Sequence, residues 1–211
     1  MFVPFQPRTA KGMSGPFQQG APRQARRVRM SAADLWLMPR SLLAEVLRDG
    51  YPIDPVALEG SAYRGVSLGL PSLVEKATWK TFQKTFLRDP ASGELRGWNV
   101  RLQQLGLEAP STPKEKGGRP WTFGHYLVRP GRDYQMPRPA PQALMIDYGP
   151  GGNGRFNPVS HMRDPIVAVN EGSVDLLLGW SYLDLGVAQL PTPIYFSLER
   201  EGPIIYVPPR L

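Results

Sequence analysis

Residues 78–104 read TWKTFQKTFLRDPASGELRGWNVRLQQ and contain two strand-like runs on either side of a short breaker, DPASG at residues 89–93. Both runs are rich in Thr, Phe, Trp and Val, which suit a pleated, half-buried surface. Asp-Pro followed by Gly favours a turn. The stretch therefore predicts a β-hairpin from which an antiparallel sheet grows.

The two arms of this hairpin alternate in character, and successive side chains of a strand point to opposite faces. In the first arm, one face carries Thr78, Lys80, Phe82, Lys84 and Phe86. In the second arm, one face carries Trp98, Val100 and Leu102, and the other carries Asn99, Arg101 and Gln103. The alternation leaves open which face points inward. An apolar interior favours a binding or scaffold protein, and a polar interior, with Asn99 and Arg101 inside, favours an enzyme.

The chain of 211 residues is long enough for one sizeable domain with appendages. Its 24 prolines and 22 glycines suit a turn-rich β protein better than a helical bundle. It has no cysteine, which excludes disulfides and thiolate chemistry. No apolar run approaches the roughly 18 residues that a membrane span needs. We expect a soluble cytoplasmic protein, since a lack of cysteine is compatible with a reducing compartment.

The net charge of +7 is concentrated at the N-terminus. Six of the 25 basic side chains and none of the 18 acidic ones fall within residues 1–30, which leaves 19 basic against 18 acidic in the rest of the chain. Residues 1–30 are also rich in Pro, Gly and Gln and show no hydrophobic period, so we expect a disordered basic tail. Such a tail suits nucleic acid or another acidic partner.

Residues 31–58 predict a helical lead-in to a β domain at residues 59–211. Ser31 is placed to cap a helix at residues 32–37, and an apolar stripe at residues 41–48 ends at Gly50. Short strand-like runs then alternate with Gly- and Pro-rich breakers. We expect a mainly β fold, an antiparallel up-and-down β-barrel of about eight or nine strands. Besides the hairpin arms, the expected strands are residues 63–68, 122–128, 143–148, 166–170, 174–182, 194–199 and 204–207.

This layout resembles that of the lipocalin-like (calycin) barrels over residues 58–207. A helix-and-coil lead-in precedes a first strand with glycines at positions 60, 65 and 69, and a short helical crossing at residues 71–77 leads into a meander of strands. Lipocalins carry Gly-x-Trp near the first strand, whereas this chain has Gly60-Ser61-Ala62-Tyr63, without the Trp. The resemblance implies a closed barrel that holds a small, largely apolar molecule.

Aromatic residues are the strongest chemical feature of the strands, because their rings can line a cavity and orient a ligand through one hydroxyl or indole N–H. Polar residues on strands would be buried only if a cavity or a partner uses them; examples are Arg64, Asn99, Arg101 and Ser181. We expect a small hydrophobic or amphipathic ligand, bound without a cofactor. Its expected binding residues are Tyr63, Trp98, Phe123, His125, Met145, Asp147 and Trp180.

A barrel enzyme is the second hypothesis. His125, Asp147 and Tyr126 offer groups for proton transfer in a lyase, isomerase or hydrolase, provided that they converge on one point. The two histidines, at positions 125 and 161, show no metal-ligand spacing, so no metal site is expected. The third hypothesis is a scaffold whose basic tail binds an acidic partner. The oligomeric state stays open.

Overall fold

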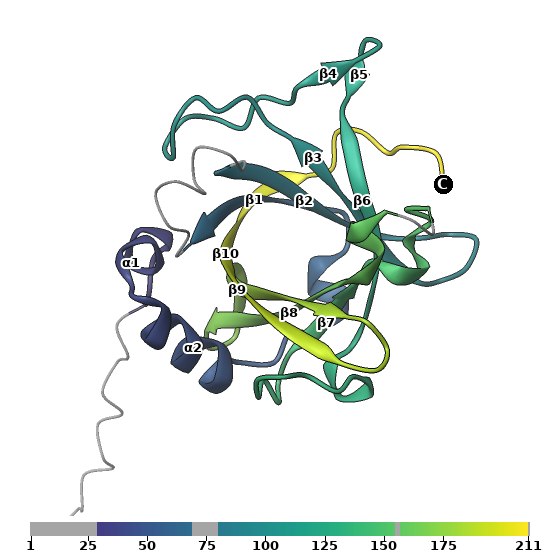
Figure 1. Cartoon of the computed structure of the whole chain (residues 1–211). Coiled ribbons are helices and arrows are strands. Elements are labelled where there is room, and N and C mark those ends of the chain that lie inside the picture. The colour runs from purple at the N-terminus through teal and green to yellow at the C-terminus, as the bar shows by residue number, and fades with distance from the viewer. Residues whose placement is uncertain (1–28, 69–79, 155–156, 211) are drawn as a thin grey trace, which may run out of the picture.

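The computed structural model describes residues 29–68, 80–154 and 157–210. Eight strands form one closed antiparallel barrel, in which β1 pairs with β10 to complete the circle (Figure 1). The expected mainly β, up-and-down barrel is thereby confirmed. A small hairpin, β4 (Glu115–Lys116) and β5 (Arg119–Pro120), is inserted between the third and fourth barrel strands. The barrel strands are β1 (Ser61–Leu68), β2 (Thr81–Arg88), β3 (Leu95–Arg101), β6 (Thr122–Pro130), β7 (Leu144–Asp147), β8 (Met162–Asn170), β9 (Ser173–Asp184) and β10 (Gln189–Pro203).

The hairpin predicted within residues 78–104 is confirmed as β2 and β3. The two strands pair antiparallel, with Lys84 opposite Asn99. In the turn, the Gly93 amide donates to the Asp89 carbonyl at 2.8 Å. Gly93 has a φ of +72°, a left-handed conformation that glycine adopts without a steric penalty. The breaker in the sequence is therefore the physical turn.

The ninth strand, expected at residues 204–207, is not formed. β10 ends at Pro203, which pairs with Ser61, the first residue of β1. Beyond Pro203 the Ile204 amide still donates to the Gly60 carbonyl at 3.0 Å, but β1 begins at Ser61, so the strand pairing goes no further. The helical crossing expected at residues 71–77 lies outside the described residues.

Most of the expected N-terminal tail, residues 1–28, also lies outside the described residues. Arg29 and Met30 are described. The side-chain amide of Asn170 accepts from the Met30 amide and donates to the Met30 carbonyl, both at 2.8 Å. The end of the predicted tail is thus attached to β8.

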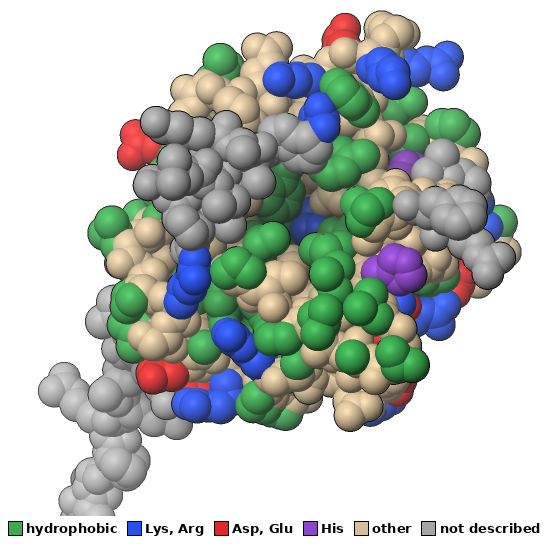
Figure 2. All heavy atoms as spheres, viewed as in Figure 1, with side chains coloured by type: hydrophobic (Ala, Val, Ile, Leu, Met, Phe, Trp, Pro, Cys, Tyr) green, Lys and Arg blue, Asp and Glu red, His purple; other side chains and the backbone are tan. Residues whose placement is uncertain are grey.

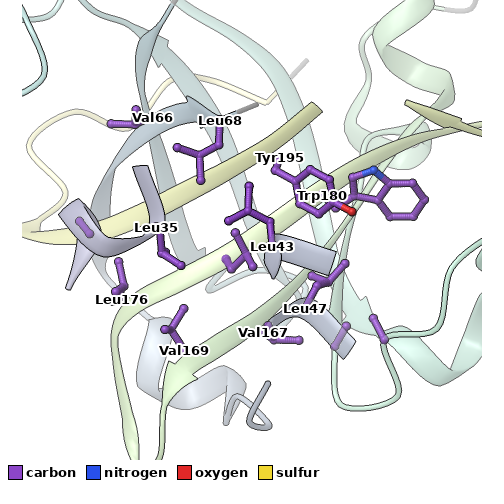
Figure 3. Close-up of a cluster of buried hydrophobic side chains, with 14 of the residues drawn as sticks. Leu35, Leu43, Leu47, Val66, Leu68, Val167, Val169, Leu176, Trp180 and Tyr195 are labelled. Carbon is purple, nitrogen blue, oxygen red and sulfur yellow. The ribbon is translucent and has the colours of Figure 1, made fainter. Parts of the chain in front are cut away.

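Two helices cover the outer face of β8, β9 and β10 (Figure 3). α1 (Ala32–Leu37) begins at Ser31, which forms a capping box with Asp34, and α2 (Arg40–Asp49) follows. Both match the predicted helical lead-in to within a residue. Their buried side chains pack on outward-facing strand residues, and this outer cluster includes Leu35, Leu43, Leu47, Met145, Val167, Val169, Leu176, Leu178, Trp180 and Tyr195.

Side chains fill the barrel interior at one end. The Tyr63 ring meets the Phe86 ring edge-on at 5.4 Å between centroids, and Phe86 meets Tyr126 at 6.0 Å. The turn of 3-10 helix η1 (Pro55–Leu58) brings Leu58 into the same cluster. The other interior residues include Leu95, Leu144, Ile146, Tyr148, Ile166, Leu177, Phe196 and Leu198. The opposite end, where β1, β3 and β9 finish and β2, β6 and β8 begin, contains a pocket.

Candidate functional site

The pocket has a volume of about 250 Å³ and apolar walls above a polar floor. Figure 2 shows a hollow in this face of the molecule, with a basic side chain at its bottom and hydrophobic side chains around it. The apolar lining residues are Phe82, Phe123, Val159, Met162, Ile194 and Phe196. The polar lining residues, which we call the floor cluster, are Ser67, Lys84, Asn99, Tyr148, Asp164 and Ser181.

Lys84 is inside the barrel because of the alternation along β2. Phe86, two residues after it, belongs to the interior cluster, and Phe82, two residues before it, packs against that cluster, so the side chain between them points the same way. Only 2% of Lys84 is exposed. Few lysines are buried to this extent without a charged partner. Asp164 on β8 is that partner, with its Oδ2 3.3 Å from the Lys84 Nζ.

A continuous hydrogen-bond network joins five of the six floor-cluster residues, namely Lys84, Asn99, Tyr148, Asp164 and Ser181. The Lys84 ammonium donates to Asn99 Oδ1 at 2.9 Å and to the Tyr148 hydroxyl at 2.5 Å. That hydroxyl in turn donates to Asp164 Oδ2 at 2.9 Å. The Ser181 hydroxyl donates to the other carboxylate oxygen, Oδ1, at 2.7 Å. Both ionic groups are therefore satisfied although they are buried.

Asn99 is oriented by a bulge in the neighbouring strand. Its side-chain nitrogen donates to the Gly124 carbonyl at 3.0 Å, so the amide oxygen faces Lys84. Gly124 has a φ of +52°, and a Cβ at this position would lie 2.7 Å from the Asn99 side-chain nitrogen. A glycine is required here both for its backbone conformation and for the close approach.

Burial dominates the electrostatics of the floor cluster. Burial lowers the pKa of Lys84, and the charge of Asp164 opposes that effect. Burial also raises the pKa of Tyr148 far above its usual range, and the Asp164 carboxylate raises it further. Tyr148 is therefore a neutral phenol at physiological pH, which accepts a hydrogen bond from Lys84 and donates one to Asp164.

Aromatic rings surround the Lys84 amine. Its Nζ lies 5.1 Å from the centroid of Tyr148, 5.2 Å from those of Tyr126 and Phe196, and 5.6 Å from that of Phe82. The faces of such rings carry negative electrostatic potential and attract cations. Gly179 makes room for one of the rings, because a Cβ there would lie 2.2 Å from the Phe196 ring. These rings therefore stabilise the positive charge of the Lys84 ammonium together with Asp164.

Three of the predicted binding and catalytic residues lie inside the barrel, namely Tyr63, Phe123 and Tyr126. Phe123 lines the pocket. Tyr63 and Tyr126 belong to the filled end, where their hydroxyls donate to the carbonyls of Val174 at 2.9 Å and Thr85 at 2.8 Å. Of the three, Phe123 therefore lines the pocket and the two tyrosines do not.

The remaining predicted ligand-binding residues lie on the outer side of the barrel wall. Met145 and Trp180 pack in the cluster beneath the helices. Trp98 and His125 contact each other, with ring centroids 6.3 Å apart. The Asp147 carboxylate accepts from the Tyr134 hydroxyl at 2.7 Å and pairs with Arg163 at 3.1 Å. None of these side chains lines the pocket.

The fold does not bring the three predicted catalytic side chains, His125, Asp147 and Tyr126, to one point. Tyr126 points into the filled end of the barrel, whereas His125 and Asp147 lie outside it. For His125 the reason is the bulge in β6, where the pairing register shifts between Gly97 and Asn99 of β3. In a regular strand His125 would lie on the same face as Phe123, two residues earlier, and the extra residue of the bulge reverses this.

Lys84, Tyr148 and Asp164 are not among the site residues predicted from the sequence. The available signal was the alternation that put Lys84 between Phe82 and Phe86, since a lysine in an apolar row needs a buried partner. The partner comes from a strand 80 residues further along the chain, and no local spacing reveals it.

Within the part of the chain that the structure describes, no helix is long and apolar enough to cross a membrane. The same residues contain no group of three or more His, Asp or Glu side chains placed to hold a metal ion. The floor cluster offers proton donors and acceptors and one primary amine. Comparison of the chain with models of known families, with curated proteins and with solved structures found no match.

Proposed function

We propose that the protein binds a small amphipathic molecule inside its barrel, in the manner of the lipocalin-like proteins. The observation that carries the proposal is the polar floor cluster around Lys84, which lines a pocket with otherwise apolar walls. A few convergent polar groups in an apolar cavity are the usual make-up of a small-molecule site. The filled opposite end makes the barrel a cup rather than a channel.

The volume and charge of the pocket restrict the ligand. About 250 Å³ is somewhat less than the roughly 300–1,000 Å³ of sites for drug-sized molecules, so the ligand is small. Lys84 and Asp164 carry opposite charges that cancel, and a further buried charge would be expensive. The polar end of the ligand is therefore neutral, a hydroxyl or a carbonyl. Its apolar part contacts side chains such as Phe123, Met162 and Phe196.

Native mass spectrometry of the purified full chain tests this proposal, because it reports a retained small molecule and the assembly together. Ser67→Trp fills the pocket from its lining, whereas Ser41→Trp places the same side chain on the exposed surface of α2. We expect a retained ligand in the wild type and in Ser41→Trp, and its loss in Ser67→Trp. If both variants retained the same amount of ligand, the ligand would lie outside this pocket and the proposal would be refuted.

Proton transfer on the bound molecule is the second candidate function. It is favoured by one contact, the Tyr148 hydroxyl that bridges Lys84 and Asp164. A phenol in this position can pass a proton between an amine and a carboxylate, as a lyase or an isomerase requires. The test is exchange of the α-hydrogens of 4-phenylbutan-2-one in deuterated water, followed by NMR. Tyr148→Phe should abolish the exchange and retain binding; exchange at the wild-type rate in the variant would exclude this role.

A further inference from the structure

The Lys84 amine is placed to react with a ligand rather than only to bind one. It lines the pocket, so a molecule on the polar floor lies beside it. Asn99, Tyr148 and Asp164 hold its Nζ in one position. Burial lowers the pKa of Lys84, which increases the unprotonated fraction relative to a surface lysine. Desolvation in an apolar pocket is one of the ways in which proteins make a lysine nucleophilic.

We propose that Lys84 forms a reversible imine with the carbonyl group of a small apolar aldehyde or ketone in the pocket. This inference rests on the proposed function and narrows its ligand class from hydroxyl or carbonyl compounds to carbonyl compounds.

Imine formation needs only the Lys84 amine and the carbonyl compound, and it releases one water molecule. The Nζ lone pair forms a bond to the carbonyl carbon, and one amine proton moves to the carbonyl oxygen to give a carbinolamine. The carbon–oxygen bond then breaks, and the hydroxyl leaves as water together with the second amine proton. Nothing is oxidised or reduced. Tyr148, 2.5 Å from Nζ and hydrogen-bonded to Asp164, is placed to carry these protons.

The surroundings of Lys84 also suit the product. An imine becomes cationic when it takes up a proton, and the Asp164 carboxylate, 3.3 Å from Nζ, is then its counter-ion. The rings of Tyr126, Tyr148 and Phe196, with centroids 5.1–5.2 Å from Nζ, stabilise the same charge. The same carboxylate and rings thus stabilise both the ammonium and the iminium, although the iminium nitrogen keeps only one N–H to donate. The reaction is reversible because water can add back to the imine carbon and release the amine.

Reductive trapping tests the imine. The full-length protein is incubated with 3-phenylpropanal and sodium cyanoborohydride, and the modified peptides are identified by mass spectrometry. Trapping adds the mass of the aldehyde less its oxygen to the reacting lysine. The exposed Lys114 is an internal control in the same sample. We expect Lys84 to be labelled at least about tenfold faster than Lys114 at pH 7, because the pocket holds the reactants together. Addition of 3-phenylpropan-1-ol should reduce the labelling of Lys84 and leave the labelling of Lys114 unchanged.

A calorimetric titration with 3-phenylpropan-1-ol separates the two proposals, since this alcohol has no carbonyl group to react. Binding of the alcohol without faster labelling of Lys84 overturns the imine and leaves the binding proposal standing. Absence of binding by the alcohol together with no selective labelling overturns both. Selective labelling of Lys84 that the alcohol suppresses supports both, and it requires no variant that might fail to fold.

Discussion

Lys84 Nζ and Asp164 Oδ2 lie 3.3 Å apart inside the barrel, where 2% of Lys84 and 3% of Asp164 are exposed. The pair joins β2 to β8, and Tyr148 bridges it from the end of β7. A buried ion pair contributes little net stability compared with an apolar pair of the same size. Its place on the floor of the pocket is the basis of the binding proposal.

Removing only one member of this pair should be costly. Lys84→Met leaves the Asp164 carboxylate buried without its cation, and we expect a loss of about 3 kcal/mol in the free energy of unfolding. The double replacement Lys84→Met with Asp164→Leu should recover much of that loss, because no charge is left behind. Urea unfolding of the wild type, both single variants and the double variant measures the coupling. Strictly additive effects would contradict the pairing.

Tyr148 and Tyr182 form a matched comparison, because both are buried but only Tyr148 has hydroxyl partners in the floor cluster. The Tyr182 hydroxyl has no hydrogen-bond partner among the described residues. Tyr148→Phe should cost about 1–3 kcal/mol, since it leaves Asp164 and Lys84 each one bond short. Tyr182→Phe should be close to neutral. Equal losses in thermal or urea unfolding would show that the network around Tyr148 adds nothing.

Asp89, in the turn between β2 and β3, should retain its charge into strong acid. Hydrogen bonds from the Arg210 side chain and from the amides of Ala91 and Ser92 lower its pKa from 3.8 to about 2. Because the folded pKa is below the unfolded one, this carboxylate stabilises the fold fully above pH 3.8, and the contribution is lost as the pH falls to about 2. Arg210→Gln should raise the pKa, whereas Arg132→Gln, at an exposed position, should not. Carboxyl-carbon NMR titration measures both; an unchanged pKa in Arg210→Gln would contradict the assignment.

The basic N-terminal segment should confer salt-dependent binding to an acidic partner. Deletion of residues 1–28 removes five of its six basic side chains and keeps Met30 on Asn170. For a single-stranded DNA probe, the slope of log affinity against log salt should be about −3 to −4 in the full chain and near zero after deletion. Fluorescence anisotropy at several salt concentrations gives both slopes. Equal slopes would exclude the segment as the binding element.

The barrel was predictable because its determinants are local. Period-two alternation and Gly- or Pro-containing breakers located the hairpin at residues 78–104 and most of the other strands. The extra strand at residues 204–207 shows the limit of local signals. Those residues have strand character, but β1 begins too late in the chain to pair with them.

The pocket was less predictable, because it depends on which face of each strand turns inward. The sequence shows that Trp98 and Asn99 lie on opposite faces of their strand, but it does not show which of the two faces the barrel interior. The structure turns Asn99 inward, and Trp98 contacts His125 outside. A bulge at Gly124 then reverses the phase of β6. Which face of a strand points inward depends on its pairing with strands that are distant in the chain, and a single sequence does not reveal those pairings.

The most direct measurement is a crystal structure of the full chain bound to 3-phenylpropan-1-ol. We expect the phenyl ring to lie against Phe123 and Phe196, with the hydroxyl within about 3.2 Å of Lys84 Nζ, Asn99 or Tyr148. An alcohol bound outside the barrel, or a pocket closed by its own side chains with Lys84 out of reach, would contradict the binding proposal.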